Sequence, residues 1–176
     1  MSYTTQQFSA ENPPLHHLVH EIDTGQLGLP DLQRPFVWKR SRIRDLLDSL
    51  YKGFPAGYFL FWDTPKEVDR HSIGADTEQK AQQKMIVDGQ QRLTSLYSVL
   101  KGKPIITEDG NEQLIEISFN PISEEFAVKS SSTENNPRNI TSISDIWTSG
   151  KGSYDFINEY LDKLREVQEV TVEEER

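Results

Sequence analysis

Polar side chains that could bind a phosphate gather at one point of the sequence, Asp88-Gly89-Gln90-Gln91-Arg92. They follow a short apolar run and precede an amphipathic stretch, which predicts a strand-to-helix turn. The N-terminus of a helix carries unpaired N–H groups and a partial positive charge, so it attracts phosphate. Arg92 adds a fork of donors suited to phosphate oxygens, and Gly89 would let a ligand approach the backbone closely. Every part needed to hold a nucleotide phosphate is therefore present within five residues.

The other side chains of this turn could supply the chemistry of hydrolysis. Asp88 could hold Mg²⁺, directly or through water, or accept a proton. Gln90 and Gln91 could bridge phosphate oxygens, contact a base edge or orient an attacking water. The chain has no GxxxxGK[ST] sequence, so the turn is not a P-loop. A plain alternative stays open, in which Asp88 is the N-cap and Gln91 completes a capping box without any ligand.

A second polar cluster lies upstream, in the sequence LQRPFVWKRSRIR at residues 32–44. Gln33 and Arg34 precede a proline that keeps the backbone extended, so both side chains project from a rigid turn. If Arg34 faces Arg92, the two Gln-Arg pairs form one convergent anion pocket.

The same segment holds two aromatic residues, Phe36 and Trp38, that could stack on a base. For Phe36 the protein core is the favoured place, and for Trp38 it stays the alternative. The four basic residues at 39, 40, 42 and 44 are interpreted as a solvated helix start, unless Arg34 proves to face Arg92.

Other candidates are weaker. His16 and His20 share a helical face and could ligate a metal, but the sequence offers no matching third ligand, so surface histidines are favoured. Trp62 and Trp147 are interpreted as core residues.

Composition limits the class of protein. The 176 residues suffice for one domain, and the absence of cysteine excludes disulfides, cysteine-ligated zinc and thiol nucleophiles. No apolar run reaches the ~18 residues of a membrane span, and the first residues lack the features of a signal peptide, so a cytoplasmic protein is expected. The net charge is −9, yet residues 33–44 carry five basic residues and no acidic one. An acidic chain with one basic segment suits a small anionic ligand better than a long polyanion.

The elements that must position these residues alternate between helices and short strands, which predicts an α+β (mixed α/β) fold. Hydrophobic periodicity predicts the helices, and short apolar or aromatic runs predict the strands. The predicted helices are 15–22, 41–51, 90–100 and 156–167, with a brief helical turn in 143–150. The predicted strands are a buried one at 57–62, one at 84–88, two around an Asp-Gly turn in 104–120, and one in 125–130. Residues 63–83 and 130–139 are predicted to be polar connections.

Two blocks of the sequence resemble a known family. The stretch LGLPDLQRPFVWKRSRIRDLLDSLYKGFPAGYFLFW, followed by MIVDGQQRLTSL, closely resembles the N-terminal domain of GmrSD-type proteins. That family groups modification-dependent restriction enzymes with related phage-defence proteins. The resemblance runs from about Leu15 to Leu100, is strongest in QRPFVW and DGQQR, and continues less specifically over residues 113–147.

The resemblance implies a fold related to ParB and sulfiredoxin, with a small mixed sheet surrounded by helices. It implies that residues 1–150 form a domain that binds a nucleoside triphosphate, ATP or GTP, together with Mg²⁺. Hydrolysis is the favoured of two open outcomes, and residues 151–176 would be a C-terminal helix with an acidic tail. The family motif falls on Asp88–Arg92, and its upstream block falls on Gln33 and Arg34.

The sequence departs from the family in one respect, because it has no cluster resembling an HNH nuclease. No nuclease activity is therefore expected in this chain. Nucleotide binding or hydrolysis would control a nuclease located elsewhere, and DNA would be contacted through that nuclease domain or a partner subunit; a homo-oligomer stays open. Two alternatives also stay open. One is a ParB-like DNA-binding module that uses residues 34–44, and the other is a non-catalytic interaction domain whose last helix docks a partner.

Overall fold

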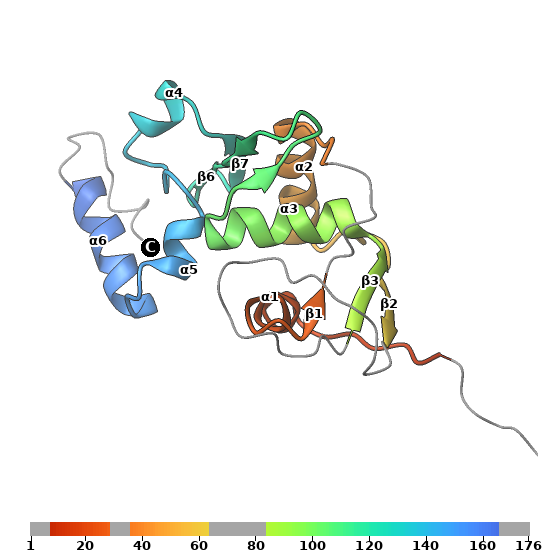
Figure 1. The fold of residues 1–176 in the computed structure, drawn as a ribbon. Coiled ribbons are helices and arrows are strands. Elements are labelled where there is room, and N and C mark those ends of the chain that lie inside the picture. Colours follow the sequence, from red (N-terminus) through yellow and green to blue (C-terminus); the bar gives the residue numbers. More distant parts are fainter. Residues whose placement is uncertain (1–7, 29–35, 64–83, 166–176) are drawn as a thin grey trace, which may run out of the picture. The chain divides into compact units, whose positions relative to one another are not determined.

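The computed structural model describes residues 8–28, 36–63 and 84–165 (Figure 1). The chain divides into two compact units. Unit 1 comprises Met1–Asp31 and Phe61–Val87, and unit 2 comprises Leu32–Leu60 and Asp88–Arg176. The Asp88–Arg92 turn and the described part of the upstream cluster therefore belong to the same unit. Gln33 and Arg34 lie outside the described residues, as do residues 64–83.

Unit 1 is built from one helix and a three-stranded sheet. The helix begins after Pro14, and its predicted apolar face is confirmed, because Leu18, Val19 and Ile22 are buried. The strand order is β1-β3-β2, with β1 and β3 parallel. The predicted strand at 84–88 is confirmed. The elements are α1 (Leu15–Asp23), β1 (Leu27–Gly28), β2 (Leu60–Asp63) and β3 (Lys84–Asp88).

The prediction of a buried strand over residues 57–62 is wrong in two respects. The strand starts only at Leu60, because Gly57 adopts a φ of +87° and the carbonyl of Tyr58 accepts a hydrogen bond from a side chain. Leu60 and Trp62 are also 57% and 52% exposed, since β2 is the edge strand of the described sheet. Trp62 is therefore not a core residue.

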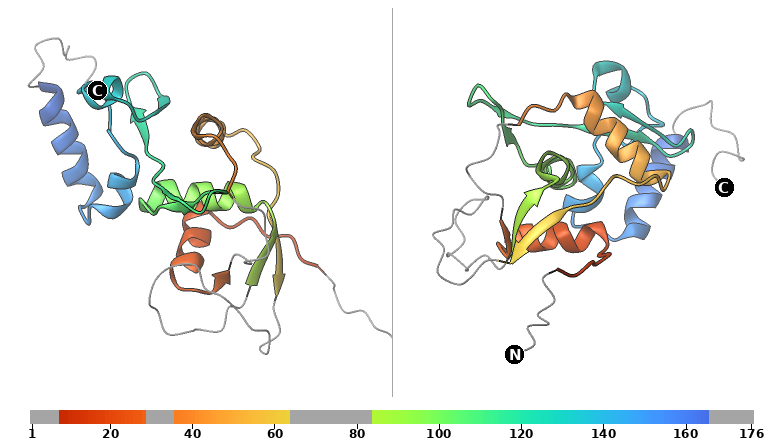
Figure 2. Two further views of the ribbon diagram at one scale, coloured as in Figure 1. Left: turned by 45° about the horizontal axis from the view of Figure 1, so that its top comes forward. Right: turned by 90° about the vertical axis from the view of Figure 1, so that its right-hand side faces the viewer.

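Unit 2 is built around two helices, α2 and α3, which contact each other (Figure 1). Strand β7 packs on α2, and β7 pairs with β6 in an antiparallel hairpin (Figure 2). Two further strands, β4 and β5, also pair antiparallel. The elements are α2 (Arg40–Tyr51), α3 (Gln90–Lys101), β4 (Ile105–Ile106), β5 (Glu112–Gln113), β6 (Ile117–Asn120), β7 (Glu125–Val128), α4 (Ser131–Glu134), α5 (Ser144–Thr148) and α6 (Ser153–Arg165).

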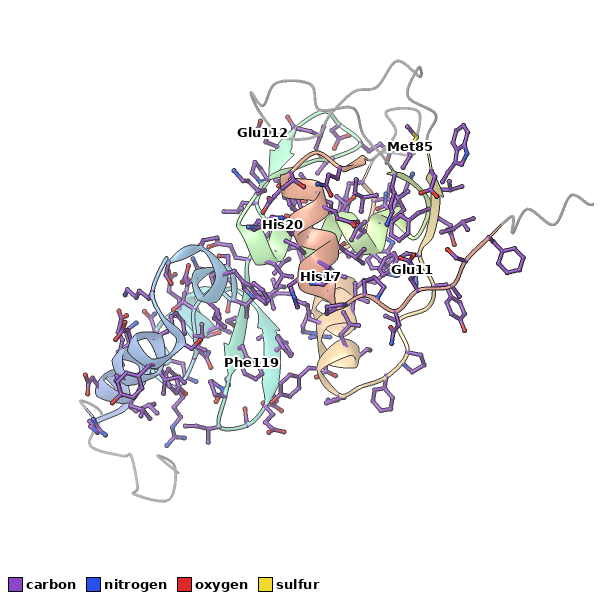
Figure 3. All side chains as sticks on the ribbon, turned by 90° about the horizontal axis from the view of Figure 1, so that it is seen from below. Glu11, His17, His20, Met85, Glu112 and Phe119 are labelled. Carbon is purple, nitrogen blue, oxygen red and sulfur yellow. The ribbon has the colours of Figure 1, made fainter. Side chains whose placement is uncertain are left out.

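The apolar face predicted for α3 is confirmed, whereas that of α2 is confirmed only in part, because its last two residues, Leu50 and Tyr51, are 37% and 50% exposed. In α2 the buried residues include Ile43, Leu46 and Leu47, and in α3 they include Leu93 and Leu96. The aromatic end of α2 is covered from the hairpin, because the ring of Tyr51 lies 5.3 Å from that of Phe119 and 5.7 Å from that of Phe126. Figure 3 labels Phe119 on β6. The predicted strands around Asp109-Gly110 and the strand at 125–128 are confirmed as well.

Some predictions for the second half of the chain need correction. Residues 130–139 are not wholly loop, because Ser130 and Thr133 form a capping box that starts the short helix α4. Trp147, predicted to be a core residue, is 48% exposed because α5 buries none of its residues. The predicted last helix is confirmed as α6, where Leu164 is buried and the Tyr160 hydroxyl donates to the carbonyl of Arg138. Val167 and the acidic tail lie outside the described residues.

The helices and small mixed sheets confirm the α+β fold class. The relation to ParB and sulfiredoxin and the division at residue 150 stay predictions. Among the described residues, none of the helices has the length and apolar character that crossing a membrane would require.

A partly exposed ion pair in unit 2, Lys129 with Glu116, makes stability depend on pH. A hydrogen bond from Lys129 to Glu116 (2.8 Å) raises the pKa of Lys129 above its ordinary value of 10.5. Its contribution to stability is therefore complete below pH 10.5 and is lost as the pH rises through the higher folded-state pKa. We expect the midpoint of urea unfolding to fall above pH 10.5 in the wild type and to fall less steeply in Lys129→Met. An unchanged profile in that variant would contradict the assignment.

Candidate functional site

The Asp88–Arg92 turn joins β3 to α3, as predicted, but its cap differs from the expected one. Gly89 is the N-cap of α3 and adopts the left-handed conformation, with a φ of +89°. The capping box of Asp88 and Gln91 is therefore wrong. The side chain of Gln91 serves another purpose, because its Oε1 accepts a hydrogen bond from the backbone N–H of Val37 (3.1 Å).

This hydrogen bond connects the turn to the upstream basic cluster. A pocket of about 470 Å³ lies at the connection, and it is lined by Val37, Trp38, Lys39, Ser41, Arg42 and Gln91. The two clusters found in the sequence thus meet at one place within unit 2. The upstream residues that form the meeting point are 37–42, while Gln33 and Arg34 lie outside the described residues.

The pocket has a positive character. Helix α2 starts at its edge, and the first turn of α2 contains no acidic residue to offset the partial charge of the helix N-terminus. Lys39 and Arg42 both line the pocket and are exposed. The guanidinium of Arg42 lies over the ring of Trp38, 4.2 Å from its centroid. A cation and an aromatic face are therefore held side by side.

The other two arginines of α2, Arg40 and Arg44, have different surroundings. With its amide oxygen turned toward Arg40, Gln113 accepts hydrogen bonds from the Arg40 guanidinium at 3.0 and 3.2 Å. Arg44 forms a salt bridge with Asp45. Lys39 and Arg42 are thus the basic residues of α2 and its cap that line the pocket.

Arg92, for which the sequence predicted a phosphate contact, donates to the backbone of the segment that follows α2. Its Nη1 donates to the carbonyl of Ala56, and its Nη2 donates to the carbonyl of Tyr58 (2.7 Å). Its guanidinium lies 5.1 Å from the centroid of the Phe59 ring. Arg92 therefore connects α3 to residues 56–59.

Gly89 was predicted to permit the close approach of a ligand. In the structure, the groups that approach it are side chains of unit 2. A Cβ at position 89 would lie 2.6 Å from Cδ1 of Phe59 and 3.1 Å from Nη2 of Arg92. Glycine is required here both by the left-handed backbone and by this packing.

The metal-binding potential of the described residues is limited. Asp88 is exposed at the end of β3, and Gln90 is partly buried at the start of α3. Within residues 8–28, 36–63 and 84–165, no group of three or more histidine, aspartate or glutamate side chains could hold a metal ion. His16 and His20, the two histidines that share a helical face, lie on α1, where Figure 3 labels His20. Mg²⁺ is usually bound by one or two carboxylates together with substrate phosphates. A single carboxylate such as that of Asp88 suits an ion that is also bound to phosphates, but it does not make a metal site by itself.

Sequence reasoning missed two parts of this arrangement. Arg42 and Lys39 were interpreted as a solvated helix start, although the acid-free basic run around them was visible. The second part is the backbone of residues 56–58, since nothing in the sequence Ala-Gly-Tyr indicates that its carbonyls accept from Arg92.

Comparison with known proteins gave one family and one relative. The family model described as "GmrSD restriction endonuclease, N-terminal domain" matches residues 15–175. The chain is 31% identical over 100 residues to the uncharacterized protein MJ0686 of Methanocaldococcus jannaschii. This match covers 52% of the chain and 17% of that relative, so the chain spans only a small part of its length. No solved structure matches the chain.

Proposed function

Because the chain belongs to the family of GmrSD restriction endonuclease N-terminal domains, we propose that it binds a nucleoside triphosphate in the pocket between α2 and Gln91. The observation that carries the proposal is the composition of this pocket: an aromatic ring, two cations and an amide around about 470 Å³. Pockets for small ligands range over roughly 300–1,000 Å³. The volume and the chemistry both suit a nucleotide.

Each side chain has a role that its position supports. Trp38 offers an aromatic ring for the base, since stacking on an aromatic face tolerates any base. Arg42 and Lys39 offer cations for the phosphates, supported by the N-terminus of α2. Gln33 and Arg34, which the family resemblance adds to the phosphate-binding set, directly precede this segment in the sequence.

We further propose that the bound triphosphate is hydrolysed with Mg²⁺. The ion would be held by the phosphates together with Asp88, and when bound it offsets the charge that develops on the phosphate oxygens. Gln90 would orient the attacking water, while Gln91 accepts from the N–H of Val37. The water oxygen bonds to the γ-phosphorus while the bond to the bridging oxygen breaks, which yields a nucleoside diphosphate and inorganic phosphate. Positioning and charge supply most of the catalysis in such reactions, so a covalent nucleophile is not required.

In this proposal the domain is the regulatory part of a restriction or phage-defence system. Binding or hydrolysis of the nucleotide would control a nuclease that lies in another domain or subunit. The family membership supports the kind of system, and the pocket supports the kind of ligand.

Isothermal titration of the chain with each nucleoside triphosphate and Mg²⁺, combined with a phosphate-release assay, tests the proposal. Saturable binding of at least one nucleotide is expected, followed by release of phosphate. Absence of binding to every nucleotide would contradict the proposal. If duplex DNA then bound with a steep dependence on salt, the ParB-like alternative would replace it.

Tryptophan fluorescence gives a local test. We expect a nucleoside triphosphate to quench the emission of Trp38, because a base stacked on an indole ring changes its surroundings. Trp38→Phe should lose most of the signal change while the domain stays folded. Trp147→Phe is the matched control, because Trp147 lies in α5 and does not line the pocket. Equal signals from both variants would place the ligand elsewhere.

A further inference from the structure

We infer that Gln91 and Arg92 are positioning residues that hold the chain segments before and after helix α2 at the start of α3, and that Arg92 does not contact the phosphates. The inference rests on the proposed function for its ligand, but its contacts are those of the protein alone. Gln91 accepts from the N–H of Val37, which precedes α2. The next residue, Arg92, donates to the carbonyls of Ala56 and Tyr58, which follow α2. Two consecutive side chains of α3 thus bind both flanks of one helix.

The space around Arg92 is shaped for this contact. Gly57 lies between the two carbonyls that accept from Arg92, and a Cβ at this position would clash with Nη1. Gly89 leaves room on the other side, where a Cβ would lie 3.1 Å from Nη2. The ring of Phe59 completes the surroundings of the guanidinium. Two glycines therefore leave room for the guanidinium next to the backbone, and an aromatic ring lies beside it.

Arg92 is not among the residues that line the pocket, and both of its Nη atoms donate to backbone carbonyls. A movement toward a phosphate would remove the donors from the carbonyls of Ala56 and Tyr58. It would also release the segment that these bonds attach to α3. The cation that reaches the ligand is instead Arg42, which lines the pocket and lies over the half-buried ring system of Trp38.

The two tethers explain how the turn can act on the pocket. Helix α2 packs on α3 through buried residues such as Ile43, and its first turn carries the pocket residue Arg42. Packing alone permits sliding or rotation of one helix on another, whereas these hydrogen bonds hold the segments before and after α2 against the start of α3. Since a misplacement of about 1 Å can cost a large factor in a binding or catalytic site, the tethers set the geometry of the pocket.

A phosphate series distinguishes positioning from contact. Affinities are measured by titration calorimetry for the mono-, di- and triphosphate of the preferred base, with wild type and Arg92→Gln. If Arg92 is a positioning residue, Arg92→Gln should weaken the binding of all three nucleotides by the same factor, about 10-fold. The ratio between the triphosphate and monophosphate affinities should then stay unchanged. A fall of that ratio in Arg92→Gln would mean that Arg92 contacts the phosphates, and would overturn the inference.

A second variant leaves the Asp88–Arg92 sequence intact. Gly57→Ala should displace the guanidinium and reproduce the uniform weakening seen with Arg92→Gln. Gly53→Ala is the matched control, because Gly53 also has a positive φ (+75°) but nothing lies within 4 Å of its Cβ position. Unchanged or stronger triphosphate binding in Gly57→Ala would overturn the inference. This variant also answers the question if Arg92→Gln fails to fold.

Amide hydrogen exchange tests the tethers without any ligand. Arg92→Gln and Gly57→Ala should accelerate exchange in residues 54–60, and Gln91→Leu should accelerate exchange of the Val37 amide. Wild-type rates in these variants would overturn the inference. Should wild type bind no nucleotide at all, the proposed function fails while the exchange data still decide whether the tethers exist.

Discussion

Arg42→Gln should lower the affinity for a nucleoside triphosphate by about 10- to 100-fold. A hydrogen bond to a charged group is worth about 1.5–3 kcal/mol, and this substitution removes the cation while keeping an amide of similar reach. It also removes the cation from the ring of Trp38, where it lies 4.2 Å from the centroid. That contact contributes only about 0.5–1 kcal/mol at an exposed site. The main loss should therefore fall on the phosphates.

The phosphate dependence separates this effect from a general one. Arg42→Gln should reduce the ratio between triphosphate and monophosphate affinity, the opposite of the pattern expected for Arg92→Gln. Arg44→Gln is the matched control, since it removes the same charge from the same helix at a residue that pairs with Asp45. Equal losses in both variants would show that net charge alone is measured, and no loss in Arg42→Gln would remove Arg42 from the site.

Leu93→Ala should destabilise unit 2 by about 2–5 kcal/mol. Leu93 is fully buried in the first turn of α3, directly after Arg92. Its truncation leaves a cavity where the turn begins, and packed interiors close such cavities only in part. Unfolding in urea, followed by circular dichroism, measures the loss.

A surface residue of the same unit provides the comparison. Ile157→Ala in α6 removes a side chain that is 54% exposed, so its effect should stay well below that of Leu93→Ala. Similar losses in the two variants would contradict the position of Leu93 in the core. The result also matters for the site, since Leu93 directly follows Arg92. Variants of residues near Leu93 must therefore be shown to fold before their binding is compared.

The central helices could be predicted from the sequence because their apolar residues repeat with the period of a helix. This periodicity reflects burial on one face, and it gave α2, α3 and the buried residues Ile43 and Leu93. The β4–β5 hairpin was predictable for a similar reason, since Asp109-Gly110 is a local turn sequence, whereas the pairing of β6 with β7 was not predicted. These features depend on residues close to each other in the chain.

The roles within the turn could not be predicted in the same way. Gln91 and Arg92 find their partners 54, 36 and 34 residues away, in backbone groups that every residue possesses. Because every residue type has these backbone groups, the sequence does not reveal which of them are partners. The polar side chains therefore indicated a phosphate instead. The exposure of Trp62 was hidden for a related reason: an edge strand and a central strand have the same local composition.

The site itself was partly predictable. The sequence raised the possibility that the two polar clusters form one site, but it could not show that they converge or which basic residues line the pocket. The direction in which each side chain leaves α2 decides this, and Arg40 and Arg42 point to different partners although they are only two residues apart.

The two tethers of α2 also restrict the length of the chain between them. An α-helix rises about 1.5 Å and turns about 100° for each residue, so one inserted or deleted residue in α2 would shift and rotate one flank against the other. Gln91 and Arg92 are neighbours on α3 and cannot follow such a shift. We therefore expect an insertion within α2 to disturb the site more than one in residues 52–55, which follow the helix without helical structure and can absorb an added residue.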